Sequence, residues 1–192
     1  MHHIYHTDSI ILESRPLGDG NKLITLFTRE LGLVKATAQS IRKIHSKLRY
    51  ALQDYSIART DLVHGRELWR ITSASPVAPL FDPMTNEYQK EAYINVAKLA
   101  SKLLPPELPI PQLYDDMVLY FQAIAGVADR ELVRNLEVLI VMRLLVALGY
   151  LPHDTGFAPL LEGSFTALEQ LPVDRLLLVS AINQALHDSH LV

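Results

Sequence analysis

The chain has 192 residues and no cysteine, which excludes disulfides, a thiol nucleophile, Cys-ligated zinc and iron–sulfur clusters. Long apolar runs are also missing. The most apolar stretch, residues 136–151, is interrupted by Glu137 and Arg143 and is shorter than the roughly 20 residues that a membrane crossing needs. Residues 1–12 lack the basic start of a secretory signal. We therefore expect a cytoplasmic protein without a membrane segment.

Sequence signatures of catalysis are lacking as well. The chain contains no Gly-x-Ser-x-Gly elbow, no His-Glu-x-x-His motif and no Walker sequence. Asp115 and Asp116 are adjacent, so on a helix they do not face each other as an acid/base pair would. The histidines near the two termini lack the four ligands of a structural zinc site. The sequence thus predicts that the protein is not an enzyme and has neither metal nor cofactor.

Basic charge is scarce overall, because the formal net charge is −3, but it is concentrated in one part of the chain. Residues 1–80 hold 11 Lys and Arg against 7 Asp and Glu, a net charge of +4. Residues 81–192 hold 7 against 14, a net charge of −7. Such asymmetry suggests a part that binds a polyanion beside a part with another role. We expect two domains, residues 1–80 and 81–192.

Residues 1–80 have the pattern of five short strands. Residues 10–12 and 22–28 flank Gly-Asp-Gly-Asn at 18–21. Despite a superficial likeness to a phosphate-binding loop, this segment is typical of a hairpin turn. Residues 33–39 alternate, with 34, 36 and 38 on one face and 33, 35, 37 and 39 on the other, which predicts a half-buried strand whose second face is mostly solvated. Residues 55–63 and 68–74 follow after a break. Five strands interrupted after the third predict an oligonucleotide/oligosaccharide-binding (OB) barrel.

The second part of the chain has helical periodicity, so the predicted fold class is α+β: a five-stranded OB-type barrel followed by an all-α domain. Helices are expected at residues 86–104, 112–125, 129–148 and 173–190, with an irregular segment at 149–172. Prolines at 105, 106, 109 and 111 make a rigid connector between the first two helices. The helix at 129–148 is apolar almost all round, which predicts a central position in a small bundle.

The strongest functional signal is the basic loop, residues 41–50, which lies in the break between the third and fourth strands. Arg42, Lys43, Lys47 and Arg49 place four cations within eight positions, without an acidic residue among them. On an OB barrel such cations would neutralise phosphates while nearby aromatic rings stack on bases. The alternative is an ordinary solvated loop. Trp69 would be a stacking platform if exposed, but its alternation with Ile71 favours the barrel core.

Several segments resemble the RecO family of bacterial recombination mediators. Residues 7–16 and 23–32 are similar to that family's first two strands. Residues 33–39, the basic Arg-Lys at 42–43, the Ser-Lys-Leu-Arg at 46–49 and the Ala-Leu-Gln at 51–53 are similar to its third strand, its basic loop and the start of its fourth strand. Residues 143–150, with Leu-Gly-Tyr at the end, resemble the end of its main helix.

The resemblance implies a protein of DNA repair, recombination and the DNA damage response that binds and anneals single-stranded DNA and is associated with the nucleoid. Its implied partners are RecR, the C-terminal tail of single-stranded DNA-binding protein, RecA indirectly, and double-stranded DNA as a further ligand. It also implies DNA contacts for the basic-loop cations and for Arg15. Strand alternation adds Lys35 and Arg70 as nucleic-acid-binding residues.

Two departures from the family pattern bear on these expectations. Many RecO proteins insert a Cys-rich zinc module after the Leu-Gly-Tyr patch, whereas this chain has no Cys, so zinc is not expected. The chain is also short for the family, and its second part is acidic. An acidic surface repels DNA. The alternative function is therefore a protein-interaction adaptor, in which the acidic helical part docks a partner and the OB part is structural.

Overall fold

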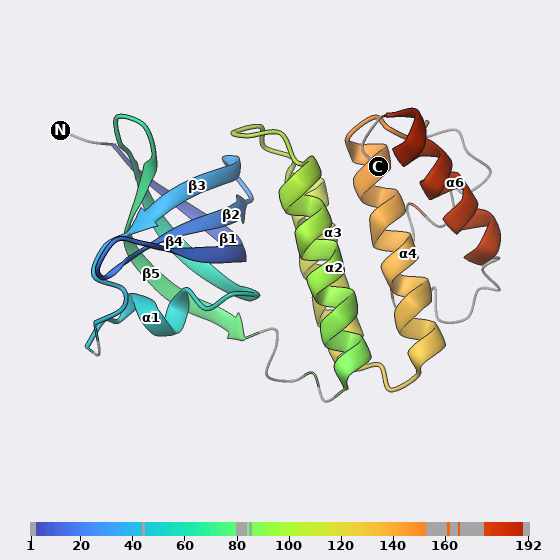
Figure 1. The fold of residues 1–192 in the computed structure, drawn as a ribbon, viewed down its shortest axis with the longest axis horizontal. Coiled ribbons are helices and arrows are strands. Elements are labelled where there is room, and N and C mark those ends of the chain that lie inside the picture. Colours follow the sequence, from blue (N-terminus) through green and yellow to red (C-terminus); the bar gives the residue numbers. More distant parts are fainter. Residues whose placement is uncertain are drawn as a thin grey trace. The chain divides into compact units, whose positions relative to one another are not determined.

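The computed structural model describes residues 3–43, 45–79, 84, 86–152, 161, 165 and 175–189. The chain divides into two compact units. The first comprises Met1–Pro83 and Ala97–Tyr114, and the second comprises Met84–Val96 and Asp115–Val192. A β-barrel is followed by helices (Figure 1), so the predicted α+β class is confirmed.

Five strands form the barrel of the first unit. They are β1 (Ile4–Leu17), β2 (Asn21–Thr28), β3 (Gly32–Ala38), β4 (Ser56–His64) and β5 (Trp69–Pro79). The barrel closes in the order β1-β2-β3-β5-β4. Adjacent strands are antiparallel except for β3 and β5, which run parallel over three residue pairs. This is the predicted OB-type barrel, with the turn at 18–20 joining β1 to β2.

Side chains that alternate along the strands fill the barrel. Ile24 and Leu26 of β2, Ala36 of β3 and Leu62 of β4 are fully buried in one cluster. Trp69 belongs to this cluster and is 6% exposed, which confirms its predicted place inside the barrel. Because the side-chain period of a strand is two, the neighbours of these residues point out of the barrel.

The prediction that the outer face of residues 33–39 is solvated is wrong at Leu33, which is buried. Residues 105–110, here called the strap, cover this end of β3. The Glu107 N–H donates to the Leu33 carbonyl over 2.9 Å, and Pro106 forms a parallel bridge with Leu33. The contact partner is more than 70 residues away along the chain, so local alternation did not reveal it. Lys35 is exposed as predicted.

The outer face of β2 is covered too. Leu23, Thr25 and Phe27 alternate with the core residues of this strand and are nevertheless buried. The Phe27 ring contacts the Tyr114 ring at a centroid distance of 5.7 Å. Many OB barrels bind oligonucleotides on the face formed by their second and third strands. In this protein the β2 part of that face is occupied by the chain itself.

The helices are α1 (Leu48–Ala51), α2 (Glu87–Leu103), α3 (Pro111–Ala125), α4 (Arg130–Ala147) and α6 (Arg175–Asp188). The bounds of the four longer helices agree with the prediction, and most of the expected irregular segment at 149–172 lies outside the described residues. Asp129 caps α4, because its carboxylate accepts from the Leu132 N–H over 2.8 Å. Among the described helices, none is both long and apolar enough to span a bilayer.

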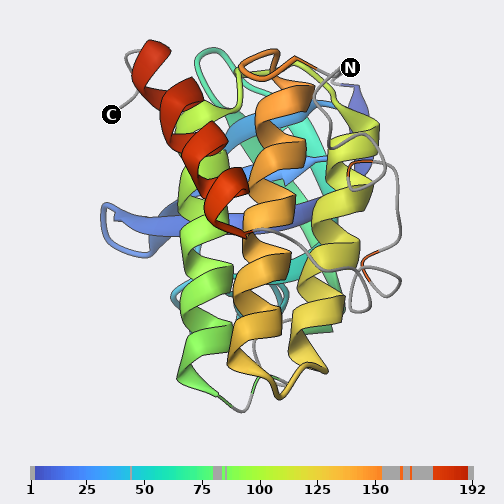
Figure 2. The ribbon, with the colours of Figure 1, turned by 90° about the vertical axis from the view of Figure 1, so that its right-hand side faces the viewer.

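In the second unit α4 occupies the central position that its apolar sequence predicts. Figure 2 shows α6 packed along α4. Polar contacts join α4 to the helices around it: Asn95 of α2 donates to Glu137, and Arg143 donates to Asp116 of α3 over 3.0 Å. The Arg143 guanidinium also lies 4.4 Å from the centroid of the Phe165 ring. The core of this unit therefore contains a buried ion pair.

Candidate nucleic-acid interface

The basic loop is fixed to the barrel by apolar residues at and just beyond its ends. Ile41 and Leu52 are 2% and 1% exposed and belong to the barrel core. Successive turns lie between them, with the Lys43 N–H donating to the Ser40 carbonyl and the Arg49 N–H to the Ser46 carbonyl. These backbone hydrogen bonds support the described residues of the loop, whose four cations are exposed.

The turn between β1 and β2 supports the loop from the other side. The Arg42 N–H donates to the Gly20 carbonyl over 3.1 Å. The Ser40 N–H donates to the Asn21 side-chain oxygen over 2.8 Å. The first hairpin and the basic loop thus form one surface at this end of the barrel.

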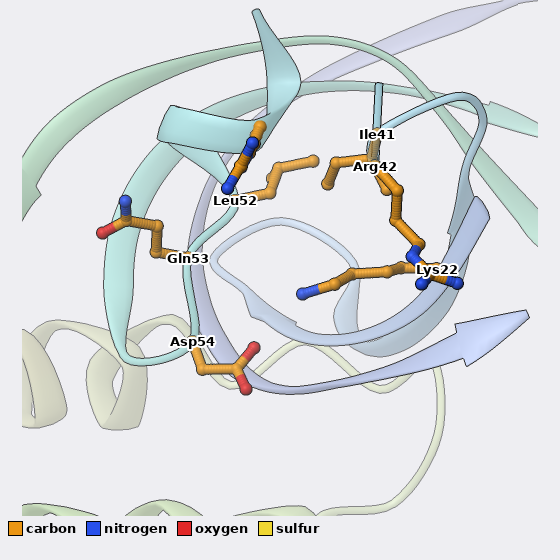
Figure 3. Close-up of a pocket in the computed structure, with 7 residues that line it drawn as sticks. Lys22, Ile41, Arg42, Leu52, Gln53 and Asp54 are labelled. Carbon is orange, nitrogen blue, oxygen red and sulfur yellow. The ribbon is translucent and has the colours of Figure 1, made fainter. Parts of the chain in front are cut away.

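A cavity of about 470 Å³ opens between these segments, and we call it the mouth cavity. Cations line it together with the two apolar anchors and two polar residues (Figure 3): Lys22, Ile41, Arg42, Arg49, Leu52, Gln53 and Asp54. In Figure 3, Lys22 and Arg42 lie on one side of the opening and Gln53 and Asp54 on the other. Three cations against one carboxylate give the cavity a net positive charge.

Lys22 is a member of this cavity that the sequence reasoning missed, because it was assigned only to the end of a hairpin turn. It lies two and four residues before the core residues Ile24 and Leu26, so it shares their inward face. Its ammonium group donates to the Ser14 hydroxyl over 2.9 Å. The sequence signal that could have revealed this position is a lysine at the start of a strand, in the same alternation as the core residues of that strand.

The basic-loop cations are not all in one place. Arg42 and Arg49 line the mouth cavity, whereas Lys43 and Lys47 are exposed on the loop outside it. Tyr50, the next residue along α1 from Arg49, is 65% exposed. Proteins that bind single-stranded nucleic acids combine exposed aromatic rings, on which bases stack, with cations that neutralise phosphates.

The other predicted site residues do not line the mouth cavity. Arg15 is exposed on β1 and pairs with Leu23, on the face of the strands opposite to Ser14 and Lys22. Lys35 and Arg70 are exposed on the outer faces of β3 and β5. The structure therefore does not gather the seven predicted cations into a single cluster.

Arg70 lines a second hollow of about 450 Å³ on the outside of the barrel, which we call the hairpin groove. It lies at the hairpin between β4 and β5 and is lined by Thr37, Val63, His64, Gly65, Arg66, Leu68 and Arg70. Arg66, at the tip of this hairpin, was not among the predicted site residues. The groove has two arginines and no carboxylate in its lining.

Within the described part of the chain, no ion pair involves Arg42, Lys43, Lys47 or Arg49. Their charge is thus available to a ligand. Beside the mouth cavity, burial and the nearby carboxylates of Asp54 and Glu13 raise the pKa of Tyr55. Its phenol therefore stays protonated at neutral pH and adds no negative charge.

Trp69 is excluded as a stacking platform by its surroundings. Its ring contacts Tyr5 and His64 edge-to-face, at centroid distances of 5.2 and 4.9 Å. Its indole N–H donates to the Glu107 carboxylate of the strap over 2.9 Å.

Among the described residues, no group of three or more His, Asp or Glu side chains is placed to hold a metal ion.

A closed five-stranded barrel whose basic loop joins the third and fourth strands defines an OB-fold domain. Residues 1–80 match the family model described as "Recombination protein O N terminal". Three relatives named DNA repair protein RecO are similar to a larger part of the chain. The relative from Pelotomaculum thermopropionicum is 31% identical over 150 residues, that from Desulfitobacterium hafniense 31% over 111, and that from a Nocardioides species 26% over 149.

These alignments cover 78%, 58% and 78% of this chain, and 57%, 41% and 61% of the three relatives. The chain thus spans about half the length of the curated relatives that it matches. The family model and the relatives agree, and both support the RecO family for this chain.

Proposed function

We propose that this chain acts in DNA repair and recombination by binding single-stranded DNA at the mouth cavity and the basic loop. The observation that carries the proposal is the convergence of Lys22, Arg42 and Arg49 on one cavity, with Lys43 and Lys47 exposed beside it. The relatives, which are named DNA repair protein RecO, support the repair role. As the family resemblance implies, the bound strand would be annealed to a complement and passed toward RecA with RecR and single-stranded DNA-binding protein as partners.

The mechanism is electrostatic and needs no chemical step. Each cation that neutralises a phosphate releases condensed counterions, so affinity falls as the salt concentration rises. The buried Ile41 and Leu52 anchor the backbone near Arg42 and Arg49, and the strand β2 carries Lys22. Tyr50 supplies a ring for one base, a contact that is typically worth about 1–3 kcal/mol. Neutralised strands repel one another less, which favours annealing.

The test is fluorescence anisotropy of a labelled oligothymidylate against the wild type and an Arg42→Ala/Lys43→Ala/Lys47→Ala/Arg49→Ala variant, across a salt series. Four phosphate contacts on a single strand predict a slope of about −3 for the logarithm of affinity against the logarithm of salt concentration. We expect the variant to lose most of this slope. Because all four side chains are exposed or line an open cavity, the variant should fold normally by circular dichroism.

Two controls make the result specific. The Arg42→Lys/Arg49→Lys variant keeps the charge and should keep the slope. Lys90→Ala/Arg130→Ala removes two cations from the second unit and should leave binding unchanged. A quadruple variant that binds with the wild-type slope would remove the mouth cavity from the proposal. A wild type that does not bind at low salt would favour the adaptor function instead.

A further inference from the structure

The mouth cavity and the hairpin groove are separate features of one barrel. They have similar volumes, about 470 and 450 Å³, and share no lining residue. In Figure 1 the hairpin between β4 and β5 and the helix α1 lie at opposite ends of the barrel. The mouth cavity involves the inward face of β2 through Lys22, whereas the groove lies on the outer surface. The two sites therefore lie on different sides of the barrel wall.

The floor of the hairpin groove is a row of three residues across adjacent strands. Arg70 of β5 pairs with Thr37 of β3 on one side and with Val63 of β4 on the other. All three line the groove. Residues in register on neighbouring strands project to the same face of a sheet. The guanidinium of Arg70 is thus carried by the rigid part of the barrel.

The wall of the groove is a tight turn. The Gly65 N–H donates to the Leu68 carbonyl over 3.1 Å, and a Cβ at Gly65 would lie 2.3 Å from that oxygen. Only glycine fits such an approach. The turn places the exposed Arg66 on the groove, while Glu67 at the same tip does not line it.

Carboxylates on the nearby outer face are already engaged. Asp61 contacts His6 over 2.6 Å, and Asp8 contacts Arg59 over 3.3 Å. Within the described residues, neither Arg66 nor Arg70 takes part in an ion pair. Lys35 adds a further exposed cation on the outer face of β3, two residues before Thr37. The groove therefore presents positive charge that is not used within the fold.

We propose that the hairpin groove is a second binding site for a single-stranded nucleic-acid backbone, so that one chain holds two strand segments at the same time. This inference rests on the proposed function, since it assumes that the mouth cavity binds the first segment. The orientation of the cations supports it, because Lys22 of the mouth cavity shares the inward face of β2 whereas Arg70 of the groove projects from the outer face of β5. The ligand chemistry is a phosphodiester backbone, which two arginines neutralise.

Energy transfer between two short oligonucleotides tests the proposal. Oligothymidylates of about eight nucleotides, within the range of OB-fold site sizes, carry either a donor or an acceptor dye. They cannot pair with each other, so transfer requires two of them on the same protein particle. We expect transfer with the wild type at low salt. We expect Arg66→Ala/Arg70→Ala to lose it while anisotropy still reports binding of one oligonucleotide.

The variants separate this proposal from its alternatives. Arg66→Lys/Arg70→Lys should restore transfer, because lysine retains the charge. If two copies of the chain merely brought their mouth cavities together, the Arg66→Ala/Arg70→Ala variant would still give transfer, and the proposal would be overturned. Binding of the wild type without transfer would overturn it as well, leaving the first site intact. If the wild type binds no oligonucleotide at all, both the proposed function and the second binding site are overturned.

Discussion

The barrel and the second unit differ in how many of their cations pair with carboxylates. In the second unit cations pair with carboxylates of the same unit: Lys90 with Glu87, Arg134 and Arg175 with Glu131, and Arg143 with Asp116. In the described part of the barrel, Arg29 and Arg59 have carboxylate partners, whereas the basic-loop cations and the two groove arginines have none. Within the described residues, the same residue types thus pair with carboxylates in the second unit and present unpaired charge at the two hollows of the barrel.

This difference shows why net charge alone is a poor guide to function. Some carboxylates of residues 81–192 form internal ion pairs, while the surplus of −7 is unchanged because each pair also uses a cation of the same part. The smaller basic surplus of residues 1–80 is concentrated at two hollows where little opposes it. Unpaired charge in a concave site attracts a ligand of opposite charge more effectively than paired charge does.

Removing one partner of the buried ion pair should have the largest effect. Asp116→Ala leaves the Arg143 guanidinium, whose side chain is 6% exposed, without its carboxylate. Breaking a buried pair in this way typically costs about 3–5 kcal/mol. Urea unfolding should show this loss. The matched control is Arg42→Ala, an exposed cation without an ion pair in the described structure, which should change the free energy of unfolding by less than about 0.5 kcal/mol. Equal effects of the two variants would contradict the contrast between the units.

The contact between strap and barrel should give the next largest effect. In Gly32→Ala the new Cβ would lie 2.1 Å from the Leu108 carbonyl oxygen, at a residue whose φ is +73°. We expect a loss of about 1–3 kcal/mol, measured by thermal unfolding. Gly18→Ala is the control, because Gly18 also has a positive φ but has no atom within 4 Å of the added Cβ. If both variants lose the same stability, the loss comes from the positive φ alone, and the contact of the added Cβ with the strap has no measurable effect on stability.

A smaller effect is expected from a partly buried carboxylate of the second unit. Burial raises the pKa of Glu137, a shift that the Asn95 hydrogen bond opposes and Glu91 reinforces. The folded state therefore keeps its proton to higher pH than the unfolded state, so stability falls as pH rises from the usual glutamate pKa through the folded one. Glu137→Gln should remove this fall.

Urea unfolding at pH 4 and pH 7 checks the effect of Glu137. Glutamine keeps an oxygen that accepts from Asn95. At pH 7 we expect the variant to be more stable than the wild type by less than about 1 kcal/mol, since one pKa unit corresponds to about 1.4 kcal/mol. The difference should vanish at pH 4. A variant that is less stable than the wild type at pH 7 would contradict the direction of the shift.

Much of the fold follows from periodicity in the sequence. Alternation placed Trp69 and Ile71 inside the barrel, and the change to helical period after residue 86 marked α2. Leu33 was assigned to solvent because its cover comes from Pro106 and Glu107, which are distant along the chain. Periodicity reports which face of a strand is apolar, and it contains no information on which segment packs against that face.

The candidate site was less accessible to sequence reasoning. A run of cations identified Arg42 and Arg49, which line the mouth cavity, but it did not identify Lys22, which arrives there from another strand. Strand alternation placed Arg70 outward, whereas its separation from the mouth cavity depends on barrel closure between β3 and β5. Side chains from different strands meet in one cavity only when the strands pair in a particular register. A pattern within one segment of the sequence does not specify how that segment pairs with another.

Trp69 has one more consequence. It is the only tryptophan of the chain, and it contacts His64 beside the hairpin groove as well as Glu107 in the strap. The chain therefore carries a single intrinsic fluorophore whose emission is free of overlapping signals from other indoles. A wavelength shift of that emission would report movement of the hairpin or release of the strap, in unlabelled protein.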